Sequence, residues 1–231
     1  MVQPPMGFVR FAFRGARLCV VAAALAGAAP AAGEPRAAFG PIPDAVWAEM
    51  QGRSWHPRPG CAPREALALL IVPYRDFDGI VRRGELVVAR HAAPDLARAF
   101  ERIFASGAFR IDRIERIDRY GGDDDASMAA NNTSAFNCRT VPGAHHLSRH
   151  AAGTAIDINP VQNPFVRGGR TVPPAGRAYD RPQKRLAAHR AGEPGIIRRG
   201  DVVWSAFRAI GWRWGGAWKE PDYHHFSEDG R

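Results

Sequence analysis

The chain has 231 residues, of which 45% are hydrophobic, so it is long enough for one compact domain with a core and short for two. Its 32 lysines and arginines outnumber 23 aspartates and glutamates, giving a formal net charge of +9. Such a charge favours an anionic partner. Nucleic acid is not expected, because the chain has an export pattern and no recognised nucleic-acid-binding module.

The amino terminus has the pattern of a signal peptide. Three arginines precede an apolar run of about a dozen residues from Leu18, and Ala29 and Ala31 form an Ala-x-Ala cleavage pattern. The run is short for a membrane span, which needs roughly 20 apolar residues. We predict a cleaved signal peptide over 1–31 and export to the periplasm or cell envelope. An uncleaved segment, which would anchor the protein in the membrane, is the alternative.

The next segment, 32–54, is predicted to be a linker with a short helix over 44–51, and a single domain is predicted over 55–231. Strands rich in aliphatic residues are predicted over 67–74 and 85–90. They are separated by a turn-like Asp-Phe-Asp-Gly sequence and should pair antiparallel.

Apolar residues at helical spacing predict helices over 94–107 and 201–211, each ending at a glycine. The segment 111–120 combines a three-residue isoleucine repeat with β-branched content, and we expect a strand toward its end. Short strands mixed with separate helices predict an α+β domain, in which helices flank a small antiparallel sheet.

A basic segment covers residues 164–199, which hold nine basic and two acidic residues. It is rich in Gly, Pro and Arg and lacks apolar periodicity, which predicts a long loop. It begins shortly after a motif at 148–160 that contains candidate site residues. It could therefore reach a cleft at that site and attract an anionic cell-wall polymer. A solvated insertion without such a role is the alternative.

The first motif, SRHAAGTAIDINP at 148–160, places His150 and Asp157 symmetrically about a Gly-Thr pair. If that pair forms a tight hairpin loop, the two side chains face each other with Cβ atoms about 5 Å apart. The isoleucines on either side of Asp157 then point to the opposite face. A carboxylate among aliphatic neighbours is costly to bury without a cation, so the motif predicts part of a metal site.

The second motif, DYHHF at 222–226, places Asp222 three residues before His225, so that one helical turn would put them on one face. Two histidines and an aspartate leave a fourth metal position open, and a carboxylate beside them can act as a general base. Either His224 or His225 could supply the second imidazole. Alone, each of these residues is more often structural or exposed. Together they indicate a zinc site with a base.

These residues match the spacing Ser-x-His-x-x-Gly-x-Ala-x-Asp followed by Asp-x-x-His, and so resemble the zinc D-alanyl-D-alanine carboxypeptidase family. That family includes D-Ala-D-Ala dipeptidases and the L-alanyl-D-glutamate peptidases of phage endolysins. The strings SMAANNTSAFNCR, NPVQNPF and GWRWGGAW extend the resemblance over roughly 55–226, to the branch labelled D-alanyl-D-alanine carboxypeptidase-like. One departure is Ser227, where the family commonly has glutamate.

The resemblance implies the fold shared by these peptidases and the signalling domain of Hedgehog proteins. It implies three zinc ligands, which are His150, Asp157 and His225, and it implies that His224 is a neighbour of the site and not a ligand. It also implies that Asp222 is the general base, that Arg139 stabilises the developing oxyanion, and that Ser148 lines the substrate site. The chemistry of a guanidinium also supports this role of Arg139 without the resemblance, because its planar N–H donors can stabilise negative charge on an oxygen.

Two cysteines, Cys61 and Cys138, remain once the predicted signal peptide is removed. In an oxidising compartment an isolated pair tends to be bridged, which in the simple model removes about 4 kcal/mol of unfolded-chain entropy. We predict a disulfide that anchors the strand before Arg139.

The predicted function is that of an exported, monomeric zinc metallopeptidase that hydrolyses an amide bond in peptidoglycan stem peptides. Removal of a terminal D-Ala, cleavage of an internal L-Ala-D-Glu bond and hydrolysis of a free dipeptide are all compatible with these residues. A catalytically silent wall-binding or signalling module that keeps zinc is one alternative, with His224 as the candidate fourth ligand. A secreted hydrolase of other peptides is another.

Overall fold

The computed structural model describes residues 1–2, 33, 35–141 and 143–231. Residues 3–31 of the predicted signal peptide, including its apolar run, lie outside this part. No helix among the described residues is both long and apolar enough to cross a membrane. One compact unit extends from Pro35 to Arg231.

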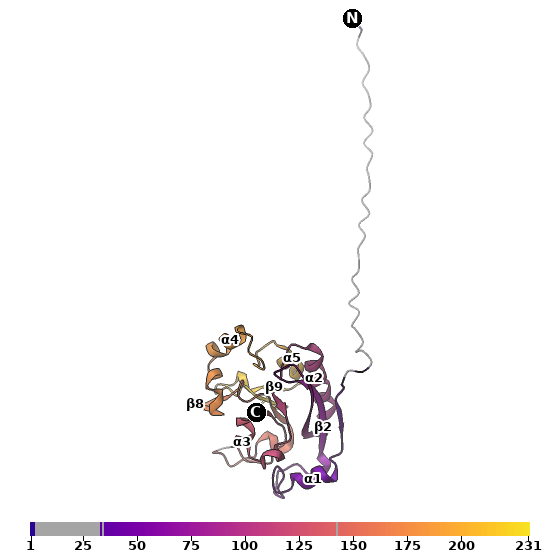
Figure 1. Ribbon diagram of the computed structural model, residues 1–231, viewed down its shortest axis with the longest axis vertical. Coiled ribbons are helices and arrows are strands. Elements are labelled where there is room, and N and C mark those ends of the chain that lie inside the picture. The colour runs from indigo at the N-terminus through magenta and orange to yellow at the C-terminus, as the bar shows by residue number, and fades with distance from the viewer. Residues whose placement is uncertain (3–32, 34, 142) are drawn as a thin grey trace. The chain divides into compact units, whose positions relative to one another are not determined.

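The first sheet is antiparallel, in the order β1-β2-β3 (Figure 1). Its strands are β1 (Ala38–Gly40), β2 (Leu67–Arg75) and β3 (Val81–Ala89). The two predicted strands and their antiparallel pairing are confirmed. The stretch 32–54, predicted as a linker, contributes more than a linker would, because β1 pairs along β2 and Met50 is fully buried.

Three helices match the predictions. They are α1 (Asp44–Met50), α2 (Ala93–Ser106) and α5 (Val202–Ala209). Helix α2 ends at Gly107 in the left-handed conformation, and the Asp201 carboxylate caps α5 by accepting from the backbone N–H of Trp204. Helix α2 packs against β2 and α5.

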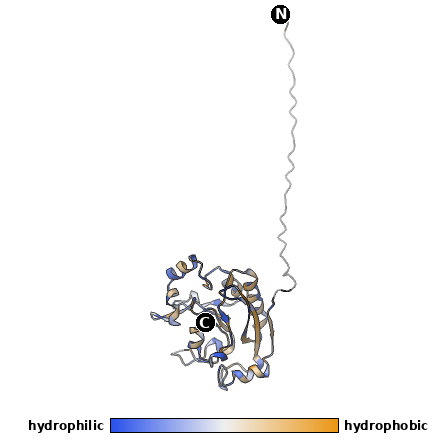
Figure 2. Cartoon of the chain, in the orientation of Figure 1, coloured by the Kyte–Doolittle hydropathy of each residue, from blue (hydrophilic) through white to orange (hydrophobic). Residues whose placement is uncertain are grey.

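The first sheet is apolar and has a hydrophobic cluster on each face (Figure 2). Leu70, Val72 and Leu86 face the main core with α2 and α5. Leu67 and Val87 pack in a second cluster, which contains Met50 of α1 and the side chains of Phe136, Cys138 and Ala151. The second cluster thus lies beside the segments that carry the two predicted site residues Arg139 and His150.

The second sheet is also antiparallel, in the order β6-β10-β9. Its strands are β6 (Ala155–Asp157), β9 (Arg213–Trp214) and β10 (His225–Ser227). As predicted, Ile156 and Ile158 enter the main core, where Phe226 of β10 stacks on Phe207 of α5. The two three-stranded sheets with separate helices confirm an α+β architecture.

The segment 111–120 differs from the prediction. Strand β4 (Arg113–Ile114) lies near its beginning and pairs in parallel with β5 (Asn132–Thr133), whereas its end is the 3-10 helix η2 (Ile117–Tyr120). Only Ile117 and Asp118 of η2 are buried, and the turn closes at a left-handed Gly121. Helix α3 (Asp124–Ala129) follows.

The basic segment 164–199 is not one long loop, so that prediction was wrong. It forms the hairpin β7 (Phe165–Arg167) and β8 (Arg170–Val172), the 3-10 helix η4 (Pro174–Tyr179) and helix α4 (Pro182–Arg190). Helix α4 buries only Arg185 and Ala188, so its sequence carries no apolar stripe. Hydrogen bonds anchor helix α4 to the rest of the fold. Arg185 donates to the Gln162 and Ile197 carbonyls and to the Asn163 side chain.

Three further 3-10 turns complete the fold: η1 (Arg64–Ala66), η3 (Arg149–Ala152) and η5 (Gly215–Ala217). The last two adjoin the motifs that contain the predicted ligands.

Candidate metal centre and active site

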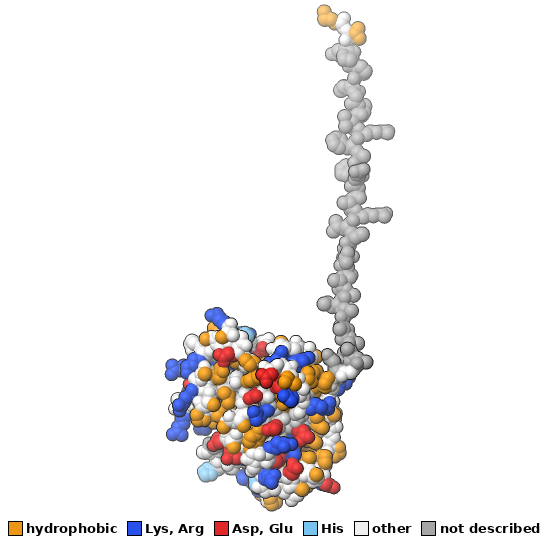
Figure 3. Space-filling view, in the orientation of Figure 1, with side chains coloured by type: hydrophobic (Ala, Val, Ile, Leu, Met, Phe, Trp, Pro, Cys, Tyr) orange, Lys and Arg blue, Asp and Glu red, His pale blue; other side chains and the backbone are white. Residues whose placement is uncertain are grey.

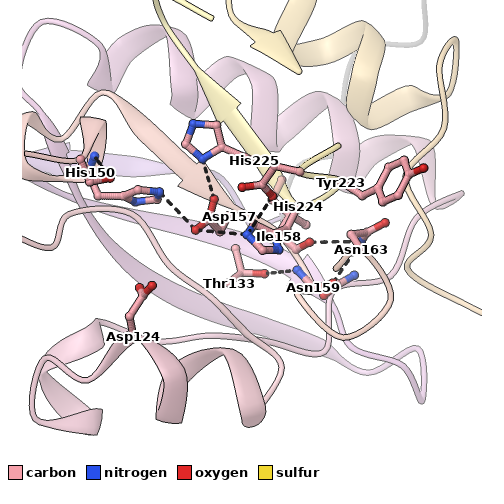
Figure 4. A network of polar contacts seen from close by, with 12 residues as sticks. Asp124, Thr133, His150, Asp157, Ile158, Asn159, Asn163, Tyr223, His224 and His225 are labelled. Carbon is pink, nitrogen blue, oxygen red and sulfur yellow. Dashed lines mark hydrogen bonds and ion pairs between the residues drawn. The ribbon is translucent and has the colours of Figure 1, made fainter. Parts of the chain in front are cut away.

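Three of the predicted site residues meet at one point. In the second sheet His225 is paired directly with Asp157, and His225 Nδ1 lies 2.9 Å from Asp157 Oδ1. His150 Nε2 lies 3.2 Å from Asp157 Oδ2 (Figure 4). One ligand atom from each of the three lies within 4.8 Å of the others, and all three side chains are buried. This spacing can hold a metal ion.

The backbone around His150 does not form the predicted hairpin. Residues 149–152 form η3, in which the Ser148 hydroxyl accepts from the backbone N–H of His150. Gly153 ends η3 at φ 71°, and its carbonyl accepts from the N–H of Ala89 on β3. The turn therefore closes on the first sheet, and β6 pairs with β10 instead of with the residues before the turn.

Backbone carbonyls fix the two imidazole rings. His150 Nδ1 donates to the carbonyl of Ala135, and His225 Nε2 lies 3.4 Å from that of Arg231. The opposite nitrogen of each ring is thus directed to Asp157. His150 Nε2 is buried and makes no hydrogen bond within the described part of the chain. Two imidazoles and one carboxylate are a donor set that zinc accepts.

Neighbouring charges shift the pKa values of Asp157 and His225 in the directions that stabilise their ionised forms. Burial alone would raise the pKa of Asp157, but the charges of His150 and His224 hold it well below its ordinary range. Burial alone would lower the pKa of His225, but the hydrogen bond and charge of Asp157 raise it. Asp157 is therefore an ionised acceptor in the centre of the cluster, as a metal ligand must be.

Asp222 lies next to this group and contacts His224. Its Oδ1 is 2.9 Å from His224 Nε2, which is itself 3.8 Å from Asp157 Oδ2. Burial alone would lower the pKa of His224, but the charges of Asp222 and Asp157 raise it to about 9. Asp222 and His225 are joined by one turn, with the His225 N–H 3.4 Å from the Asp222 carbonyl, although no helix forms there.

Arg139 pairs with a residue that the sequence reasoning missed. Its Nη2 lies 2.6 Å from Oδ2 of Asp124, the first residue of α3, and both side chains are mostly buried. Burial raises the pKa of Asp124, and the charge of Arg139 opposes that rise. The one signal in the sequence was position, because Asp124 stands just before the string SMAANNTSAFNCR that ends at Arg139.

That string positions the ligands through its backbone. Ser134 pairs with the backbone of Asp157, and Ala135 supplies the carbonyl that holds His150. The N–H of Asn137 then donates to the carbonyl of His150. The Arg139 carbonyl in turn accepts from the N–H of Ser148, whose side chain is half-buried.

The predicted disulfide between Cys61 and Cys138 is present, with Cα atoms 5.5 Å apart. Because Cys138 directly precedes Arg139, the bridge fixes the segment that carries the guanidinium, although residues 135–139 form no strand, contrary to the prediction. Trp218 is half-buried and its ring centroid lies 5.4 Å from that of His225, so it forms a wall of the site, whereas Trp212 fills the core.

Comparison with known protein families gives one match. Residues 142–228 match the family model described as D-alanyl-D-alanine carboxypeptidase. This segment contains the three candidate ligands and Asp222, and the match confirms the predicted family resemblance there. Residues 55–141, with Arg139 and both cysteines, lie before it, so the resemblance of that part stays a prediction. No curated protein and no solved structure matched the chain.

Proposed function

We propose that this chain, whose residues 142–228 match the D-alanyl-D-alanine carboxypeptidase family, is an exported zinc peptidase that hydrolyses an amide bond in peptidoglycan stem peptides. The observation that carries the proposal is the buried group of His150, Asp157 and His225, whose ligand atoms lie within 4.8 Å of one another. The family match supports the peptidase chemistry. The predicted signal peptide and the disulfide support export.

His150 Nε2, a carboxylate oxygen of Asp157 and His225 Nδ1 would hold zinc, which would supply a Lewis acid for the scissile carbonyl and a lower pKa for the attacking water. Asp222 takes a proton from that water and returns it to the leaving amine. His224 holds the Asp222 carboxylate from one side. Arg139 meets the negative charge that develops on the carbonyl oxygen, and the half-buried Ser148 lines the substrate side.

The proposal includes the fold shared by these peptidases and Hedgehog signalling domains, a monomeric state and a location in the periplasm or cell envelope. The silent zinc-containing module is not favoured. It would need a fourth protein ligand, and His224 is engaged with Asp222 and lies outside the group of three. A hydrolase of other peptides would use the same residues, so only its substrate would differ.

Defined muropeptides test this function directly. The mature protein, loaded with zinc, is incubated with stem pentapeptides, shorter stems and free D-Ala-D-Ala, and the products are identified by mass. We expect one of these bonds to be cut, and we expect cleavage to stop on chelation and return with added zinc. Stoichiometric zinc without cleavage of any wall fragment would contradict the proposal and favour the silent module.

A further inference from the structure

We propose that Asp124 is a positioning residue, which holds the guanidinium of Arg139 in the orientation that faces the substrate. The inference rests on the proposed function for its catalytic consequence, but the orientation itself can be tested without turnover. Asp124 is not one of the three candidate ligands, and its carboxylate contacts Arg139 at 2.6 Å.

The pair is largely removed from water. The Arg139 and Asp124 side chains are 24% and 19% exposed, so the contact is stronger than a surface ion pair. Figure 4 shows the Asp124 carboxylate rising from its helix toward the side where His150 and Asp157 lie. Without a cation beside it, this carboxylate would add a second buried negative charge next to Asp157. Arg139 offsets that repulsion through its contact with Asp124.

Only part of the Arg139 guanidinium has a partner among the described residues. Its Nη2 faces Asp124, whereas its Nε is buried and makes no hydrogen bond within the described part of the chain. A buried N–H without an acceptor is unfavourable unless a ligand oxygen completes it. Asp124 therefore holds the guanidinium through Nη2, and Nε–H keeps its hydrogen-bonding capacity free of any acceptor among the described residues.

The chain between the two residues is built to keep them together. Asp123 caps α3 by accepting from the N–H of Ala126, and Asn132 is held by bonds to Ser127 and to the Glu115 carbonyl. At the far end the disulfide of Cys138 fixes the backbone beside Arg139. The middle of the segment, at Asn132, and its far end, at Cys138, are thus fixed by bonds other than the ion pair. The ion pair adds a direct contact between Asp124 and the guanidinium.

The first test measures the orientation directly. In zinc-loaded protein with 15N-labelled arginine, Arg139→Lys assigns the Arg139 Nε–H signal. We expect Asp124→Asn to shift that signal and speed its exchange with water, while Asp125→Asn leaves it unchanged. Asp125 is the matched control, because it is the next residue of α3 and is exposed. An Arg139 signal that is the same in Asp124→Asn and wild type would overturn the proposal.

The second test is a double-mutant cycle in hydrolysis. Asp124→Asn should lower kcat/KM by about 10- to 100-fold, mainly through kcat, with zinc content unchanged. In an Arg139→Ala background, Asp124→Asn should change kcat/KM by about twofold or less, because the guanidinium that Asp124 positions is absent. Asp124→Glu, which keeps the charge, should recover most of the rate. Equal losses in both backgrounds would overturn the positioning role. Inactive wild-type protein would refute the proposed function, and the Nε–H signal would still decide the inference.

Discussion

His150 and His225 each have one ring nitrogen directed to a backbone carbonyl and the other to Asp157. This arrangement selects a different donor nitrogen in each ring, Nε2 in His150 and Nδ1 in His225. The Ala135 carbonyl belongs to the backbone, so the orientation of His150 does not depend on a further side chain. A ring held in this way needs less ordering when an ion binds.

Asp222 should be essential for turnover but not for zinc. It lies outside the group of three ligands, so Asp222→Asn should leave zinc stoichiometry unchanged and lower kcat by about 10²- to 10⁴-fold, the usual contribution of a general base. Hydrolysis rate and bound zinc are measured on the same sample. Glu220→Gln is the control, since that carboxylate is exposed and pairs with Arg167. Loss of zinc in Asp222→Asn would make Asp222 a ligand and contradict its role as base.

Zinc binding should release protons from the metal-free protein, and its affinity should rise with pH. Burial lowers the pKa of His225, but the hydrogen bond and charge of Asp157 raise it above its ordinary value, so protons compete with zinc for this ring up to a higher pH than for a free imidazole. Asp157, whose pKa is well below its ordinary range, is already ionised and releases none. Titration calorimetry in buffers of different ionisation enthalpy measures the release. A binding enthalpy independent of the buffer, with affinity constant across pH, would contradict this.

The three residues that meet could be predicted from the two motifs together with the family resemblance. The motifs combine imidazole and carboxylate at a fixed spacing, and the resemblance selected His225 over His224. The sequence could not reveal Asp124. An aspartate at the start of a helix is ordinary, and its role depends on how far the chain folds back to Arg139. The contact of His224 with Asp222 was also missed, since spacing alone favoured His225 as the neighbour of Asp222.

Among the elements, η3 depends on its closing glycine. Gly153 has a φ of 71°, and a Cβ there would lie 2.5 Å from the backbone nitrogen of Ala89. Gly153→Ala should therefore destabilise the protein by more than the roughly 1–3 kcal/mol of backbone strain alone, and should weaken zinc binding by shifting His150. Denaturant unfolding and zinc affinity measure the two effects.

Gly107 provides the control for that substitution. It is also left-handed, at φ 63°, but a Cβ there would meet nothing within 4 Å. Gly107→Ala should show only the cost of strain and leave zinc affinity unchanged. Equal effects of the two substitutions would mean that the close approach of Gly153 to Ala89 has no consequence.

The long strands and helices α2 and α5 were predictable because their apolar residues repeat with the period of the element. A turn and a polar helix could not be predicted in this way. The turn at 149–153 was expected as a hairpin, yet the bond from Ala89 to Gly153 that decides it comes from a distant strand. Helix α4 was expected as loop, because Arg185 holds it by hydrogen bonds and not by an apolar face.

At the scale of the molecule, the basic segment forms a folded surface that contacts the motif of the candidate site. The N–H of Val166 donates to the Pro221 carbonyl, and Tyr223 lies under the Arg185 guanidinium at 4.0 Å. Figure 3 shows lysine and arginine side chains gathered at the left edge, where Figure 1 places β8 and α4. The exposed basic residues of the segment are Arg167, Arg170, Arg177, Arg181, Lys184, Arg190, Arg198 and Arg199.

This surface should bind an anionic wall polymer and bring the site to its substrate. Replacing Arg170, Arg177 and Arg181 with glutamine should reduce binding to purified peptidoglycan sacculi, because three exposed positive charges are lost from the basic segment. Turnover of a small muropeptide should stay unchanged, since none of the three is among the candidate site residues. Wild-type binding should weaken as salt rises, because exposed charges are screened. Cosedimentation with sacculi measures the binding.

A second triple variant separates the surface from net charge. Arg58, Arg102 and Arg119 are exposed and lie outside the segment, so their replacement with glutamine changes the charge of the protein by the same amount. We expect this variant to bind sacculi nearly as well as wild type. Equal loss in both variants would mean that total charge, and not the face over β8 and α4, attracts the polymer. Full retention of binding by the first variant would leave the segment as a solvated insertion.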